Sequence, residues 1–231
     1  MDILKIISRL MDYPSAKLQP LVAELESVIL DAREISPDMR QRLTALLHQI
    51  YDGDLMDAQE CYTGLFDRGR ALSLLLFEHV HGESRDRGQA MVDLLAVYRS
   101  QGFHIDVREL PDFIPLYLEF LAHRPDMEAR EGLADVAHIL GLLSARLKER
   151  GSSYDTLFDS LLMISGVPID VEKLRAKTAS EQRDDTPEAL DKIWEEEAVT
   201  FGAGGGDSCP SNTPQPPQRS PNDSVAIRWA N

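Results

Sequence analysis

Apolar residues recur every three or four positions along most of the chain, which is the spacing of one face of an α-helix. Sustained alternation of apolar and polar residues, the pattern of a half-buried β-strand, is missing. The pattern therefore predicts an all-α protein without a sheet. Representative apolar positions are Cys61, Leu65, Phe66, Met91, Leu94, Leu95, Tyr98, Leu133, Val136, Ala137, Leu140, Leu147, Leu157, Phe158, Leu161 and Leu162.

Helix boundaries can be predicted from capping residues and from glycine and proline. Ser36 before Pro37, and Thr186 before Pro187, place a capping hydroxyl ahead of a proline at the first helical position. Asp57 with Glu60 has the form of a capping box. We expect a compact single-domain bundle of about nine to eleven helices. Breaks are expected near Pro14, Gly53, Gly69, Gly82, Gly102, Pro125, Gly151 and Gly166.

The composition changes near the carboxyl end. Residues 202–231 are rich in Gly, Pro and Ser and hold too few large apolar residues to offset the entropy cost of folding. We expect a folded domain over residues 1–201 and a disordered tail after it. The preceding stretch, Glu181–Glu197, has eight acids against two basic residues, and Leu190, Ile193 and Trp194 form an apolar stripe on it.

The formal net charge of the chain is −15, which disfavours binding to nucleic-acid phosphates and suits a basic partner. The amino terminus does not have the pattern of a secretory signal, and no segment approaches the ~20 apolar residues of a membrane span. Two cysteines, Cys61 and Cys209, form neither a disulfide framework nor a zinc-ligand spacing. These features predict a cytoplasmic protein without stable membrane insertion.

The segment Glu78-His79-Val80-His81-Gly82-Glu83 contains residue types that bind metal ions. Histidines two positions apart lie on nearly opposite sides of a helix, so the spacing argues against a shared ion. We therefore expect no metal site and no catalytic residue. A metal-dependent enzyme that uses Glu78, His79, His81 and Glu83 is kept as an alternative hypothesis.

Two charged turns, Asp67–Arg70 and Ser84–Gly88, flank the strongly apolar Leu72–Phe77. They are either solvated helix ends with mutual ion pairs or the rim of an apolar groove. In a groove, arginines would bind a carboxylate or phosphate, and aspartates would bind a basic side chain.

Three segments carry a resemblance to a known family: residues 62–95, Glu109–Leu121 (ELPDFIPLYLEFL) and Asp184–Glu197 (DDTPEALDKIWEEE). Together they resemble the NarJ/NarW family of respiratory nitrate reductase assembly chaperones, within the TorD-like class, over about residues 1–201. The resemblance implies a helical protein with no catalytic activity, which holds the apo catalytic subunit while its molybdenum bis-guanine-dinucleotide cofactor is inserted. It also implies that no cofactor is stably bound by the chaperone itself.

The implied partner is the basic, amphipathic amino-terminal segment of the nitrate reductase catalytic α subunit, with cofactor-delivery proteins as further partners. A same-class chaperone for another molybdoenzyme is the nearer alternative. Phe113 stands where the wider class often has histidine, and we expect Asp112 to cap the helix that follows. Leu116, Tyr117 and Phe120 are expected in the core.

We predict that the peptide binds in a groove whose apolar residues include Phe66, Leu74, Phe77 and Tyr98, with acids on the rim. The predicted peptide-binding residues are Phe66, Asp67, Arg70, Leu74, Phe77, Glu78, His79, His81, Glu83, Arg85, Arg87, Tyr98, Glu109 and Asp112.

Truncation after Phe201 should preserve folding, because a segment without large apolar residues contributes little packing. Thermal unfolding of the truncated and full-length chains would check this. A large loss of thermal stability on truncation would contradict the expected domain boundary.

Overall fold

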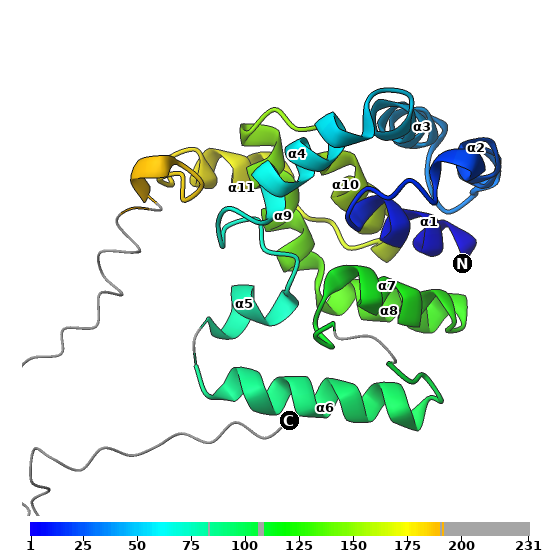
Figure 1. Cartoon of the computed structure of the whole chain (residues 1–231). Coiled ribbons are helices and arrows are strands. Elements are labelled where there is room, and N and C mark those ends of the chain that lie inside the picture. Colours follow the sequence, from blue (N-terminus) through cyan, green and yellow to red (C-terminus); the bar gives the residue numbers. More distant parts are fainter. Residues whose placement is uncertain (83, 106–108, 190, 192–231) are drawn as a thin grey trace, which may run out of the picture. The chain divides into compact units, whose positions relative to one another are not determined.

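A computed structural model describes residues 1–82, 84–105, 109–189 and 191, and within these it confirms the all-α prediction (Figure 1). Eleven α-helices and one short 3-10 helix occur there, with one isolated β-bridge and no strand. The helices are α1 (Asp2–Met11), η1 (Gln19–Leu21), α2 (Val22–Asp31), α3 (Pro37–Tyr51), α4 (Leu55–Phe66), α5 (Leu76–His81), α6 (Asp86–Ser100), α7 (Ile114–Ala122), α8 (Asp126–Asp135), α9 (Ala137–Glu149), α10 (Asp155–Ser165) and α11 (Val171–Thr178).

The first helix packs against a helix more than 100 residues later in the chain. Ile3, Ile7 and Leu10 of α1 are buried at helical spacing, and α1 lies against α7. The Ser8 hydroxyl donates a 2.8 Å hydrogen bond to the carbonyl of Pro115. Pro115 lies in the first turn of α7, where a missing N–H costs no helical hydrogen bond, as the sequence predicted.

Helix α9 contacts both α10 and α11 (Figure 1). Its buried residues Leu140, Leu143 and Leu147 recur at helical spacing, and Leu157 and Leu161 of α10 are equally buried. The turn after α10 is closed by Gly166, whose φ of 71° is the left-handed conformation that favours glycine. The regular apolar spacing thus places the α9–α10 contact at the centre of the core.

Most of the predicted helix starts and breaks are confirmed. The Ser36 hydroxyl accepts a hydrogen bond from the Met39 N–H, and the Thr186 hydroxyl accepts one from the Ala189 N–H. The capping box at Asp57 is wrong, because α4 begins earlier. Its N-cap is Asp54, whose carboxylate accepts a 2.9 Å hydrogen bond from the Met56 N–H, and Asp57 lies in the first turn instead.

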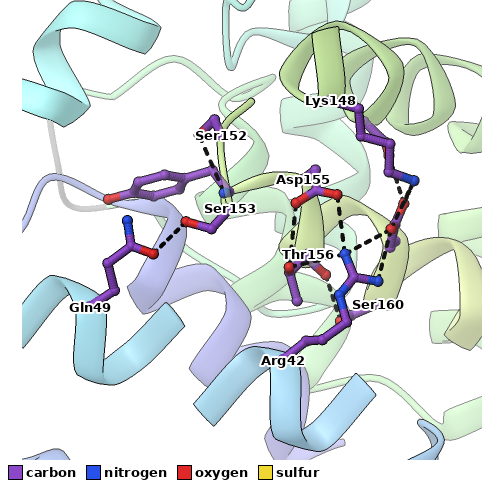
Figure 2. A network of polar contacts seen from close by, with 11 residues as sticks. Arg42, Gln49, Lys148, Ser152, Ser153, Asp155, Thr156 and Ser160 are labelled. Atoms are coloured by element: carbon purple, nitrogen blue, oxygen red, sulfur yellow. Dashed lines mark hydrogen bonds and ion pairs between the residues drawn. The ribbon is translucent and has the colours of Figure 1, made fainter. Parts of the chain in front are cut away.

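A charge-balanced polar network joins α3, α9 and α10 (Figure 2). The Asp159 carboxylate accepts hydrogen bonds from Arg42 at 3.2 Å and from Lys148 at 3.0 Å. Arg42 also reaches Asp155 at 3.1 Å, and burial raises the pKa of that carboxyl, as does the neighbouring Asp159. Two cations therefore face two carboxylates, so no charge in this partly buried network is left without an opposite charge.

Several expectations concern the carboxyl end. The predicted domain end at 201, the tail 202–231 and the apolar stripe of Leu190, Ile193 and Trp194 lie outside the described residues. In the part that the structure describes, no helix is long and apolar enough to cross a membrane.

Replacing Asp159 with Asn should lower the free energy of unfolding by about 1–3 kcal/mol, because two cations lose their shared carboxylate in a partly buried site. Glu128→Gln is the matched control. It also removes one carboxylate charge, but its pair with Arg124 is more exposed, so we expect less than about 1 kcal/mol. Urea unfolding of both variants measures the difference, and equal losses would contradict a special role for the network.

Candidate functional site

Two segments without helical structure pair with each other between α4 and α7. Leu75 and Phe113 form an antiparallel β-bridge. The Ile114 N–H donates to the carbonyl of Leu74 at 2.8 Å, and the Leu76 N–H donates to the carbonyl of Asp112 at 2.9 Å. The bridge thus joins the first two of the three segments that carry the family resemblance.

Asp112 is fully buried at this bridge, with a relative exposure of 0%. Its carboxylate accepts a 3.1 Å hydrogen bond from the Phe77 N–H, in the first turn of α5. The prediction that Asp112 caps α7 and stands on a groove rim is wrong. The N-cap of α5, Leu75, has no side chain that could accept a hydrogen bond from the first turn, and the paired backbone brings the Asp112 carboxylate there instead.

A hollow of about 280 Å³ opens beside the bridge, and we call it the bridge groove. Residues of α4, of the segment after it and of the segment before α7 form its walls. Its lining residues are Tyr62, Phe66, Asp67, Ser73, Leu74, Leu75, Glu109, Leu110 and Phe113.

Aromatic rings support the groove from beneath. The ring centroids of Phe66 and Tyr62 are 4.9 Å apart, and Phe66 lies edge-on to Tyr154 at 5.3 Å. All three residues are buried, and the Tyr62 hydroxyl donates to the carbonyl of Met11. The rings therefore form a fixed apolar floor, since packed aromatic groups lose little further entropy when a ligand binds.

The rim of the bridge groove is acidic. Asp67 and Glu109 line the groove and are exposed to solvent. Burial raises the pKa of the Tyr62 phenol, and the negative charges of Asp12, Asp67 and Glu109 raise it further. An apolar floor with exposed carboxylates suits a ligand that combines apolar and cationic groups.

A second, smaller hollow of about 140 Å³ is lined by Arg70, Glu78, Gly82 and Arg87. Glu78 and Arg87 form a 3.1 Å ion pair across it. The predicted residues Phe66, Asp67, Leu74 and Glu109 therefore share the bridge groove, whereas Arg70, Glu78 and Arg87 share this second hollow. The sequence suggested one continuous groove, and the structure separates the predicted residues between two hollows.

Other predicted residues lie outside both hollows. Tyr98 is fully buried, with its hydroxyl on the carbonyl of Pro111 and its ring 4.7 Å from Phe120, and it does not line the bridge groove. An apolar helix residue with a hydroxyl is equally suited to a core position where that hydroxyl finds an acceptor. Phe77 meets the His81 ring edge to face, Arg85 is exposed, and Glu83 lies outside the described residues.

The histidines of the suggested metal cluster contact different groups. His79 Nε2 is 2.8 Å from the carbonyl of Ser73, whereas His81 contacts the Phe77 ring. Within residues 1–82, 84–105, 109–189 and 191, no group of three or more His, Cys, Asp or Glu side chains is arranged to hold a metal ion. His79 therefore contacts the segment before α5.

Several lining residues of the bridge groove were not predicted from the sequence. Tyr62 lies one helical turn before Phe66, so helical spacing could have identified it. Ser73, Leu75, Leu110 and Phe113 were not identifiable in this way, because they meet only through the long-range bridge.

Comparison with known families gives a match to the model of the nitrate reductase delta subunit family over residues 32–159, more than half of the chain. The chain belongs to this family. The match includes the whole bridge groove and confirms the resemblance described from the sequence.

Relatives within this family have similar lengths. The chain is 54% identical to the nitrate reductase molybdenum cofactor assembly chaperone NarJ of Escherichia coli, over 89% of this chain and 88% of the relative. It is 45% identical to the probable chaperone NarW of the same species over 99% and 96%, and 29% identical to a probable NarJ of Bacillus subtilis over 68% and 84%. These relatives are named as assembly chaperones and not as catalysts.

Burial lowers the pKa of the His79 imidazole below its ordinary value near 6.5, and the Arg146 charge lowers it further. The unfolded chain therefore binds the proton more readily, and stability falls as the pH drops below the ordinary value. His79→Gln should reduce the loss of unfolding free energy between about pH 7 and about pH 5.

His48 provides a control of opposite sign. The hydrogen bond of His48 with Asp52 raises the pKa of its imidazole, so the folded state binds the proton more readily and His48 contributes stability to the protein on acidification. His48→Gln should therefore enlarge the loss of unfolding free energy on acidification. Urea unfolding at both pH values measures these differences. An identical pH dependence in His79→Gln and the unaltered protein would contradict the expected contribution.

Proposed function

We propose that this protein is a system-specific assembly chaperone of respiratory nitrate reductase. It binds the amino-terminal segment of the apo catalytic α subunit and keeps that subunit competent for insertion of the molybdenum bis-guanine-dinucleotide cofactor. It acts in the cytoplasm, delays docking to the membrane subunit and is absent from the final enzyme. Family membership and the names of the relatives support this proposal.

The bridge groove is the observation that carries the proposal. Its aromatic floor would accept apolar side chains of an amphipathic peptide, and its exposed carboxylates, Asp67 and Glu109, would meet the basic ones. A hollow of about 280 Å³ is small for a whole helix, so we expect it to take anchoring side chains while the rest of the peptide lies over its rim.

Binding of this kind could shift the client between two states. A chaperone with higher affinity for the open, cofactor-receptive apoenzyme raises the population of that state in proportion to the difference in affinity. Closure around the inserted cofactor would remove the preferred state and release the chaperone. In this scheme the chaperone needs no stable binding site of its own for the cofactor.

Reversing the charges of Asp67 and Glu109 to Lys should weaken binding of the client's first ~15 residues at least about tenfold, roughly 1.4 kcal/mol. The reason is that both acids lie on the groove rim, and the effect should shrink at high salt because exposed charges are screened. Calorimetric titration at two salt concentrations provides the measurement.

The matched control is Glu24→Lys with Asp31→Lys, which changes the net charge equally at exposed positions of α2. Equal weakening in both double variants would mean that net charge, and not the groove, attracts the peptide. No binding by the unaltered protein would move the contact elsewhere on the apoenzyme. Tighter binding to the leader of another molybdoenzyme would favour the alternative client.

A further inference from the structure

The carboxylate of Asp184 reaches back onto the segment between α4 and α5, which is 113 residues earlier in the chain at its contact with Ala71. One of its oxygens accepts a 2.6 Å hydrogen bond from the Ala71 N–H, and the other accepts a 3.0 Å hydrogen bond from Arg150. The third segment of the family resemblance thus meets the first one here.

Gly69 makes this approach possible. A Cβ atom built on Gly69 would lie 2.5 Å from Asp184 Cγ and within 2.7 Å of both carboxylate oxygens. The φ of Gly69 is not positive, so the backbone alone does not require glycine there. The carboxylate of Asp184 is therefore the group that alanine at this position would displace.

Arginines hold the other side of this contact. Arg146 donates to the carbonyl of Ala71 at 2.9 Å and pairs with Glu181, while the largely buried Arg150 also pairs with Asp185 at 3.2 Å. Both backbone polar groups of Ala71 are thus hydrogen-bonded to side chains from distant segments.

Only Leu72 and Ser73 separate Ala71 from Leu74, whose carbonyl accepts the hydrogen bond of the β-bridge. Besides the contact of His79 with the Ser73 carbonyl, the segment Asp67–Leu75, which supplies four lining residues of the bridge groove, has two further attachments. One is the bridge at its carboxyl end, and the other is the contact of Ala71 with Asp184 and Arg146 near its middle.

We infer that Asp184 is a positioning residue for peptide binding. Asp67 follows α4 directly, where its N–H donates to the carbonyl of Thr63, and Asp184 fixes the chain four residues later at Ala71. Asp184 thus restricts the segment on the carboxyl side of the rim residue Asp67, without touching the peptide itself. This inference rests on the proposed function. Without the Asp184 contact, this part of the chain would have to become ordered during binding. The conformational entropy lost in that step would weaken the affinity for the peptide.

Asp184→Ala should weaken binding of the client's amino-terminal peptide about fivefold or more. Asp184→Asn retains an acceptor for the Ala71 N–H but loses the charge facing Arg150, so it should weaken binding less. Asp185→Ala is the matched control, since it removes a neighbouring carboxylate that pairs with Arg150 and Arg183. Equal weakening by Asp184→Ala and Asp185→Ala would overturn the inference.

Gly69→Ala provides an independent test from the other side of the contact. It should weaken binding as much as Asp184→Ala, and it should add no further loss in a chain that already carries Asp184→Ala. Such non-additivity is expected only if both changes break one contact. Unchanged affinity in Gly69→Ala would overturn the inference.

Amide hydrogen exchange of the free full-length protein separates this inference from the proposed function. Residues 67–71 should exchange faster in Asp184→Ala and Gly69→Ala than in the unaltered chain or Asp185→Ala. Unchanged exchange, or faster exchange with unchanged peptide affinity, would overturn the positioning role. If the unaltered protein does not bind the client's amino-terminal peptide while exchange responds as expected, the proposed function fails. The contact of Asp184 with Ala71 would then still be shown to hold residues 67–71.

Discussion

The arrangement of the site depends on the pairing of residues 74–76 with residues 112–114. Leu74, Leu75, Asp112 and Phe113 lie outside the helices, and Leu76 and Ile114 are the first residues of α5 and α7. Their buried backbone groups need partners at these positions, because an unpaired buried N–H or carbonyl is costly. Each segment satisfies the other, and the Asp112 carboxylate satisfies a further N–H at the start of α5. This set of hydrogen bonds fixes the bridge groove, the direction of α5 and the start of α7 relative to one another.

The all-α class and many helix boundaries were predictable from the sequence, because periodicity, capping and glycine breaks are local properties. Ser36 and Thr186 cap as predicted for this reason. Asp112 was misassigned because an aspartate before a helix is also able to cap a different helix, and the sequence does not reveal which one. The contact between Asp184 and Gly69 was equally hidden, since it forms only after distant helices pack.

In the candidate site too, local features were predictable from the sequence and long-range contacts were not. Phe66, Asp67, Leu74 and Glu109, from two segments that the resemblance marked, line the same hollow, and their role in peptide binding stays a prediction. Tyr98 is buried in the core, and periodicity gives the buried face of a helix but does not distinguish a core contact from a binding surface. The rim acids and the aromatic residues of the groove come from separate segments, so only the folded chain brings them together as one surface.

The bridge between Leu75 and Phe113 also closes a chain excursion that contains α5 and α6. The two ends of this chain segment lie next to each other, because they are hydrogen-bonded to each other. Changes in its length alter the closure entropy only slowly and need not displace the helices on either side. Such changes are confined to the turns of this segment, because the Tyr98 side chain of α6 is buried against Phe120 of α7 and so attaches α6 to the core.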